Sequence, residues 1–345
     1  MERRSIPTPV TDAPAPGPAS VDHSFTLMGT HMRLVIGNPA SATAPDPQDA
    51  RAAALELLED YNGRLSRFRE DSELCRLNAD PRATVPASEL LRDAVSAALL
   101  AAEYTGGLVD PTLLGRLEAA GYTDSWDRSL RLDLREALDG PRPASHPAAA
   151  SPEAAWRAVR VDDAAGTITR PIGLRLDTGG TGKGHAADRV AALLEGYDAW
   201  VIDCGGDLRL GGQAGAVREI EVEHPFTGET IETIRARDGA VATSGIRSRI
   251  WRAPDGSVRH HLLDPSTGEP AFTGLVAVTA LAPTAVEAEA LAKAALLSGP
   301  ARARAVLQRH GGITVAEDGS AERIGRLEPA PRIRLRIPTT RSTDT

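Results

Sequence analysis

The stretch of residues 176–207 constrains the fold of this chain more than any other segment. It reads LDTGGTGKGHAADRVAALLEGYDAWVIDCGGD, in which a strand end, a glycine loop, a helix, a buried strand and a second glycine turn follow one another. The loop of residues 177–184 places four glycines beside one carboxylate, Asp177, and one ammonium group, Lys183. Glycines let the backbone approach a bulky anion closely, and Lys183 adds positive charge. The loop therefore predicts a site for a phosphate-bearing ligand.

Two common phosphate-binding loops do not match this stretch. The Walker pattern requires a Gly where Asp177 stands and a Ser or Thr where Gly184 stands. The dinucleotide-binding pattern from Gly180 lacks its third Gly, because His185 occupies that position. Two readings remain open. Either this is a different nucleotide loop, or it is a strand-to-helix turn in which Asp177 caps the helix and Lys183 is solvated.

Composition narrows the class of protein. A chain of 345 residues can bury one large core or two smaller ones. The net charge of -8, with no Lys or Arg run between aromatic residues, argues against a nucleic-acid partner. No apolar run is long enough to span a membrane, and the N-terminus resembles neither a signal peptide nor a lipoprotein leader, so a cytoplasmic location is expected. Cys75 and Cys204 are expected to be small buried hydrophobes.

Hydrophobic periodicity predicts a mixture of helices and strands. Helices are expected over residues 49–68, 88–104 and 285–297. A short helix is expected to end near residue 78, and a further helix is expected to end at the glycines at 311–312. Strands or hairpins are expected over 25–37, 158–170, 173–176, 199–202, 219–223, 231–235, 240–243, 249–263, 275–281 and 313–324. Residues 1–23 and 332–345 are predicted to be disordered tails, and residues 124–155 an irregular insertion.

Eight motifs follow one another between residue 25 and about residue 300. They are MGT from Met28, LSRFREDSELCRLN from Leu65, TGGLVDPT from Thr105, DTGGTGKGHAAD from Asp177, CGGD from Cys204, TSG from Thr243, HLLDPSTGEP from His261 and APTAVEAEALAKA from Ala282. Together they resemble the ApbE family, the FAD:protein FMN transferases. The resemblance implies a mixed α+β fold over residues 24–331, related to the T-fold, with FAD in an extended cleft.

The same resemblance implies an activity and its partners. FMN would pass from FAD, through its phosphate, to a Ser or Thr hydroxyl of an acceptor flavoprotein, with release of AMP and with Mg2+ as the family's metal. Such a transfer needs positioned phosphates, neutralised charge and a proton acceptor. A non-catalytic FAD-binding protein and an FAD pyrophosphatase are the alternatives.

The resemblance also assigns site residues one by one. Contacts to FAD are expected from Met28, Phe68, Leu108, Val109, Asp110, Asp177, Lys183 and Leu262. For Met28 and Phe68, ordinary core packing is an equal alternative, whereas Asp110 is hard to explain as core. His261 is the expected general base, because an imidazole titrating near neutrality can remove a proton from a hydroxyl. His260 and His261 are neighbours on a predicted strand, where successive side chains point to opposite faces, so only one of them is expected to face a pocket.

The expected metal ligands depart from the family pattern. The resemblance implies Gly180, through its carbonyl, together with the positions of Glu289, Ala292 and Lys293, where the family usually has Asp, Ala and Thr. Glu289 keeps an oxygen ligand, but the Lys293 ammonium cannot ligate and repels a divalent ion. Glu289 and Lys293 also have the spacing of a helix ion pair. Lys293 could take the metal's place, metal could bind differently through Glu289 and FAD, or FAD could bind without transfer.

Overall fold

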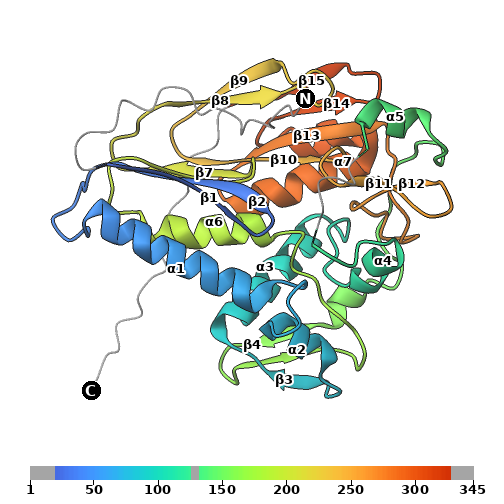
Figure 1. Ribbon diagram of the computed structural model, residues 1–345, viewed down its shortest axis with the longest axis horizontal. Helices are drawn as coiled ribbons and strands as arrows, with labels where there is room; N and C mark the ends of the chain where they lie inside the picture. Colours follow the sequence, from blue (N-terminus) through green and yellow to red (C-terminus); the bar gives the residue numbers. More distant parts are fainter. Residues whose placement is uncertain (1–19, 126–131, 328–345) are drawn as a thin grey trace, which may run out of the picture.

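The computed structural model describes residues 20–125 and 132–327, and it is built around one antiparallel sheet (Figure 1). The strand order is β1-β2-β6-β7-β10-β13-β14-β15. The strands are β1 (Val21–Leu27), β2 (Thr30–Ile36), β6 (Trp200–Cys204), β7 (Leu208–Gly211), β10 (Gly239–Gly245), β13 (Leu275–Ala282), β14 (Gly312–Ala316) and β15 (Ala321–Ile324). Sequence-adjacent strands pair at both edges, while β10 and β13 bring distant segments into the centre.

Helices cover one face of this sheet (Figure 1). α7 packs on β10 and β13, α6 packs on β6 and β7, and α1 lies against both α6 and the edge strand β1. The helices are α1 (Pro47–Leu65), α2 (Glu73–Ala79), α3 (Glu89–Tyr104), α4 (Leu114–Ala119), α5 (Leu134–Asp139), α6 (Gly182–Leu193) and α7 (Ala285–Leu307). The largest apolar cluster fills the layer between these helices and the sheet.

The opposite face of the sheet is covered by a hairpin of β8 (Arg218–Glu223) and β9 (Thr230–Ala236) (Figure 1). Alternate residues of β8 are buried, as expected for a strand with one face on a core. Ile220 and Ile234 join a second apolar cluster with Val201, Val241 and Leu281 from the main sheet. The sheet is thus buried on both faces, and the mixed α+β class expected from the sequence is confirmed.

Smaller elements complete the chain. The expected hairpin at 158–170 is present as β4 (Arg160–Asp162) and β5 (Thr167–Thr169), preceded by a short 3-10 helix (Ala155–Ala158). It gains a third strand, β3 (Thr84–Pro86), which the sequence did not predict. The hairpin expected at 249–263 is present as β11 (Ile250–Arg252) and β12 (Val258–His260).

The segment expected as one interrupted strand at 25–37 is instead a hairpin. Its register pairs Leu27 with Thr30, so Met28 and Gly29 alone form the turn. Both have positive φ, 53° and 70°, as two-residue hairpin turns of type I′ require. The first strand begins at Val21, inside the stretch expected to be a tail; residues 1–19 and the C-terminal tail lie outside the described residues.

Two further expectations were wrong in detail. Residues 173–176 form no strand. The stretch expected to be irregular contains α5, which Asp133 caps by accepting from two backbone N–H groups. The two helices expected between residue 285 and the glycines at 311–312 are present within α7, which is interrupted at Gly299, whose φ of 72° and ψ of 171° are not helical.

Candidate active site

A cavity of about 700 Å3 opens beneath the sheet. The β1–β2 turn, the end of α1, the loop before α4, the glycine loop before α6, and α7 all contribute to its walls. Its lining includes Met28, Arg67, Phe68, Leu108, Val109, Asp110, Tyr122, Asp177, Gly180, Lys183, Arg249, His261, Leu262, Glu289 and Lys293. The volume is in the range typical of small-molecule and cofactor sites.

The glycine loop is folded by Asp177 itself. The Asp177 Oδ1 atom accepts from the backbone N–H of Gly179 (2.8 Å), and the Asp177 N–H donates to the Pro111 carbonyl (2.8 Å). The N-cap of α6 is Thr181, which makes no side-chain capping bond. The alternative in which Asp177 caps the helix is therefore wrong, and the carboxylate faces the cavity instead.

Lys183 forms an ion pair with a buried carboxylate. Its ammonium group pairs with Asp207 Oδ2, and the Lys183 side chain is 24% exposed against 2% for Asp207. Burial by itself lowers the pKa of Lys183, but the negative charges of Asp207 and Glu289 outweigh that effect, so the pKa is raised. Lys183 is therefore a permanent cation rather than a solvated surface group. The turn at residues 205–207 supplies its partner, Asp207.

Glu289 joins α6 to α7 at the floor of the cavity. One carboxylate oxygen accepts from the Gly184 backbone N–H (2.8 Å) and the other from the Lys293 ammonium (2.8 Å). The expected helix ion pair is thus present, with Glu289 only 1% exposed and Lys293 14% exposed. Ala292 is fully buried and is absent from the cavity lining.

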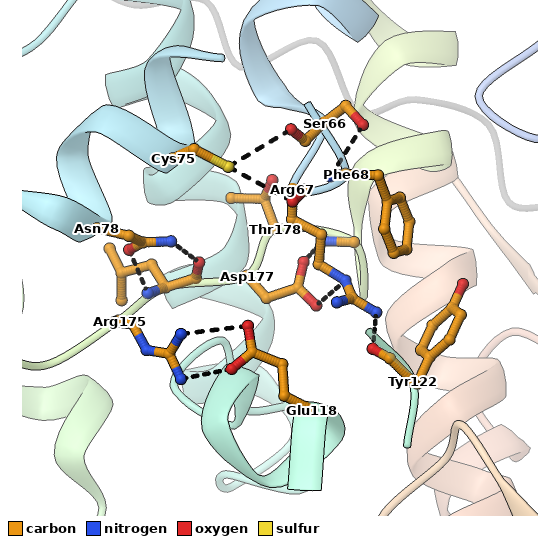
Figure 2. A network of polar contacts seen from close by, with 12 residues as sticks. Ser66, Arg67, Phe68, Cys75, Asn78, Glu118, Tyr122, Arg175, Asp177 and Thr178 are labelled. Carbon is orange, nitrogen blue, oxygen red and sulfur yellow. Dashed lines mark hydrogen bonds and ion pairs between the residues drawn. The ribbon is translucent and has the colours of Figure 1, made fainter. Parts of the chain in front are cut away.

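A guanidinium group packs against two aromatic rings, which also contact each other edge to face, at another wall (Figure 2). The Arg67 guanidinium lies 4.1 Å from the centre of the Phe68 ring and 4.4 Å from that of Tyr122. It also donates to the Tyr122 carbonyl (2.8 Å) and lies 3.6 Å from Asp177 Oδ2. Figure 2 shows Arg67 bridging these partners. Flat, polarisable surfaces of this kind suit a planar ring ligand.

Asn78 explains why residues 173–176 need no strand partner (Figure 2). Its side-chain amide donates to the Leu176 carbonyl (2.8 Å) and accepts from the Leu176 N–H (2.7 Å). This pair of bonds is what a neighbouring strand would provide. Beside it, Arg175 and Glu118 form a two-bond ion pair (3.1 and 2.6 Å) that ties the segment to α4. The chain entering the glycine loop is therefore fixed by side chains.

The Asp110 carboxylate makes hydrogen bonds through only one of its two oxygens within the described residues. Its Oδ1 atom accepts from the Thr112 N–H (2.8 Å) and hydroxyl (2.6 Å). Its Oδ2 atom is buried and has no hydrogen-bond partner among the described residues. Burial raises the pKa of this carboxyl, against the lowering effect of the Thr112 bonds. A buried polar atom without a partner is costly, so Asp110 is suited to a ligand donor.

The two neighbouring histidines lie in different surroundings, as the strand pattern predicted. His260 is 0% exposed and its ring makes a T-shaped contact with Phe272, 4.8 Å between ring centres, whereas His261 lines the cavity and its ring is T-shaped to that of Tyr122. The Nδ1 atom of His261 is buried and has no partner among the described residues.

The charge state of His261 differs from the expectation. Burial lowers its pKa well below the usual value, and the charges of Arg249, His260 and Lys293 lower it further. The imidazole therefore does not titrate near neutrality. It is neutral there, which leaves a free nitrogen that can accept a proton.

The structure thus brings together the expected site residues with the exception of Ala292. Sequence reasoning missed Arg67, Tyr122, Arg249 and Asp207 as members or supports of the site. Arg67 lies beside Phe68 within a quoted motif, so adjacency alone was a usable signal. Nothing in the sequence pairs Tyr122 with Phe68 or Asp207 with Lys183, because these contacts join residues far apart in the chain.

Two kinds of feature are absent from the described residues. No helix within residues 20–125 and 132–327 is long and apolar enough to cross a membrane. Within the same ranges, no group of three or more His, Cys, Asp or Glu side chains is arranged to hold a metal ion.

Comparison with known proteins identifies relatives over most of the chain. The model of the ApbE family matches residues 28–316. An FAD:protein FMN transferase of Treponema pallidum is 31% identical over 76% of this chain and 75% of its own length, and one of Salmonella typhimurium is 30% identical over 82% and 80%. The crystal structure of an ApbE protein from Thermotoga maritima superposes with a TM-score of 0.71 at 30% identity, covering 88% of this chain and 97% of that one. The chain belongs to the ApbE family.

Proposed function

We propose that this protein is an FAD:protein FMN transferase, acting on a Ser or Thr hydroxyl of an acceptor flavoprotein. The hydroxyl oxygen attacks the phosphorus of the FMN half of FAD. A new phosphorus–oxygen bond forms to the acceptor, and the bond from that phosphorus to the bridging oxygen breaks. AMP leaves with the bridging oxygen, and the hydroxyl proton passes to a base on the enzyme. No oxidant or reductant is needed.

One observation carries this proposal. A single cavity presents a cationic glycine loop on one wall and an aromatic–guanidinium stack on another. FAD combines a diphosphate with two flat ring systems, so the two walls match its two kinds of chemistry. The relatives named FAD:protein FMN transferase support the same substrate.

We assign the diphosphate to the glycine loop. Backbone N–H groups at the start of α6 and the Lys183 ammonium provide donors and positive charge there. The ion pair with Asp207 fixes the position of the Lys183 ammonium group. Phosphoryl transfer depends mainly on positioning and charge neutralisation of this kind.

We assign the flavin and adenine rings to the apolar and stacked walls. Phe68, with Arg67 and Tyr122, forms the stacked wall, while Met28, Leu108, Val109 and Leu262 line the rest. Asp110 has one unpartnered buried oxygen, which a ring N–H or a ribityl or ribose hydroxyl of FAD can satisfy. Asp177, tied to the loop and to Arg67, connects this wall with the phosphate side.

His261 is the proposed general base. Its free Nδ1 atom and its neutral ring allow it to accept the acceptor's hydroxyl proton. The proton moves from the attacking oxygen to the imidazole as the new phosphorus–oxygen bond forms. The positive charges of Arg249 and Lys293 nearby then favour release of that proton after transfer.

The test is AMP release from FAD by the purified protein, with a threonine-bearing flavinylation-motif peptide and with the matched peptide carrying alanine. We expect AMP with the threonine peptide and little with the alanine peptide. Equal AMP with both peptides, together with free FMN, would indicate hydrolysis of FAD instead of transfer. Bound FAD with no AMP would indicate a binding protein without this activity.

A further inference from the structure

Lysine is used at only two positions in this chain, and both are in the cavity. Lys183 and Lys293 are the only lysines in the sequence, and the other 37 of its 39 Lys and Arg residues are arginines. Both line the cavity, one from α6 and the other from α7. A Lys ammonium is a compact point charge with freely rotating donors, whereas Arg presents a broad planar fork. The cavity therefore contains two small cations in a protein that uses Arg elsewhere.

Each of these ammonium groups forms an ion pair with one buried carboxylate. Lys183 pairs with Asp207, which is 2% exposed, and Lys293 pairs with Glu289, which is 1% exposed. An ammonium group has three N–H donors. With one donated to the carboxylate, each lysine keeps further donors for oxygens in the cavity.

The residues do not fit the divalent metal that family resemblance implies. Mg2+ requires nearly octahedral oxygen ligands at about 2.0–2.1 Å. Both Glu289 oxygens already accept from N–H donors, those of Gly184 and Lys293. Each oxygen keeps a second lone pair, but Glu289 is 1% exposed and a metal on it would lie close to the Lys293 ammonium charge. Ala292 offers no side-chain ligand and does not line the cavity.

The Glu289 contacts also join α6 to α7 where the two helices lie closest. The Gly184 N–H that Glu289 accepts from belongs to the first turn of α6, where the two helices touch. A Cβ atom on Gly184 would lie 2.5 Å from the Ala285 carbonyl oxygen. The carboxylate is thus clamped between α6 and α7, and it holds Lys293 one helical turn further along the cavity wall.

We propose that the Lys293 ammonium, held by Glu289, takes the place of a divalent cation beside the diphosphate of FAD, so that this protein binds FAD without added metal. The extension to catalysis rests on the proposed function: FMN transfer then also proceeds without metal. Lys293 donates hydrogen bonds to non-bridging phosphate oxygens and gives up no proton, so the bonds made and broken in the transfer are unchanged.

The first test measures FAD affinity by quenching of flavin fluorescence, in EDTA and in Mg2+. For the wild type we expect the two dissociation constants to agree within about twofold. Lys293→Met should weaken FAD binding in EDTA by about tenfold or more, since it removes a charge-assisted hydrogen bond. Lys293→Arg keeps the charge and should lose less. A wild type that binds FAD tenfold more tightly with Mg2+, or a Lys293→Met variant that binds normally, would overturn the proposal.

A double variant provides the converse test. Glu289→Asp with Lys293→Thr removes the ammonium and restores a short carboxylate and a hydroxyl one helical turn apart. This variant should bind FAD weakly in EDTA and recover with Mg2+. If it binds FAD equally in both buffers, these positions do not govern cation use and the proposal is wrong.

Lysine acetylation gives a readout that does not depend on activity. Because only two lysines are present, mass spectrometry of the acetylated protein can report each of them. FAD in EDTA should protect Lys293 as well as Lys183, with the α-amino group as the unprotected internal control. Acetylation of Lys293 that is unchanged by saturating FAD would contradict the assignment.

Activity separates this proposal from the proposed function. AMP release with the threonine peptide should be equal in EDTA and in Mg2+. Release only in Mg2+ would overturn the metal-independent mechanism and leave the transferase assignment intact. Metal-independent FAD binding without AMP in either buffer would overturn the transferase assignment and leave the role of Lys293 in binding intact.

Discussion

His261 is the residue on which the proposed chemistry depends most. Replacing it by Asn removes the proton acceptor but leaves the cavity walls in place. General base catalysis typically contributes 10²–10⁴-fold, so we expect FMN transfer by His261→Asn to fall by about that factor. FAD affinity should change by less than about threefold. Single-turnover AMP release and flavin fluorescence measure the two quantities, with the exposed His146→Asn as control. A variant that transfers FMN at the wild-type rate would remove His261 from the mechanism.

The pH dependence of the wild type tests the same residue. The pKa of His261 lies well below 6.5 because of burial and the neighbouring Arg249 and Lys293 charges. Since only the neutral ring accepts a proton, activity is lost when the pH falls below the folded-state pKa. In the free enzyme kcat/KM for FAD reports this pKa, so the acid limb should lie clearly below pH 6.5. A limb centred at or above pH 6.5 would be inconsistent with the buried, cation-flanked imidazole.

His260 has a consequence for stability rather than for catalysis. Burial lowers its pKa to about 3, while the unfolded chain has an ordinary His pKa of about 6.5. Below pH 6.5 the unfolded state therefore binds a proton that the folded state does not, and stability falls with pH. At about 1.36 kcal/mol per pKa unit, the loss attributable to His260 reaches about 2 kcal/mol at pH 5.

His260→Asn should reduce that loss. Its side-chain oxygen can replace Nδ1, which accepts from the Leu262 N–H at 3.3 Å, but it cannot titrate. Urea unfolding at pH 7 and pH 5 should show a smaller drop for the variant than for the wild type, although the variant starts lower because it loses the Phe272 contact. The exposed His146→Asn should keep the wild-type difference. An unchanged drop in His260→Asn would refute this explanation of acid sensitivity.

At the scale of elements, the contact between α6 and α7 places the two lysines on one cavity. Gly184 makes this approach possible, because a Cβ atom there would lie 2.5 Å from the Ala285 carbonyl oxygen. Gly184→Ala must push the helices apart, and overpacking of this kind costs about 1–3 kcal/mol. We also expect weaker FAD binding, since the same shift breaks the Glu289 bond.

A glycine in another helix serves as the matched control. Gly63 lies in α1 with nothing within 4 Å of a Cβ atom. Gly63→Ala should therefore stabilise the protein by about 0.5–1 kcal/mol through helix propensity. Thermal unfolding of both variants measures the contrast. Equal effects of the two substitutions would mean that the helix contact is not tight.

Elements with strong local signals could be predicted from the sequence, and those defined by distant partners could not. The helix expected over 88–104 is present as α3, and Ser88 caps it by accepting from the Leu91 N–H. Residues 173–176 read as a strand, but their partner is the Asn78 side chain, which no local pattern reveals. The β1–β2 turn was missed because Met28, a residue that rarely adopts positive φ, occupies its first position.

At the scale of the whole molecule, the cavity joins segments from most of the chain. The β1–β2 turn, α1, the glycine loop, α7 and residues 261–263 all line it. A ligand that contacts them together should stabilise the fold by mass action, by about 2.7 kcal/mol at a free concentration 100 times its dissociation constant. We expect FAD to raise the unfolding temperature, and Lys183→Met to abolish most of that rise. An unfolding temperature indifferent to FAD would contradict the placement of FAD in this cavity.

The site was predictable to the extent that short motifs name its residues. Asp177, Lys183, His261 and Glu289 lie within such motifs, and the fold gathers them around one cavity. The supports were not predictable in the same way. Asp207 beneath Lys183 is set by the pairing of β6 with β7, a property of the sheet and not of a motif.

The most direct test of FMN transfer by this protein is the intact mass of a threonine-bearing acceptor peptide after incubation with the protein and FAD. We expect a mass gain of one FMN per peptide, accompanied by one AMP per FMN, in EDTA as in Mg2+. An unmodified peptide in both buffers, from a protein that has demonstrably bound FAD, would contradict the assignment of this cavity to FMN transfer.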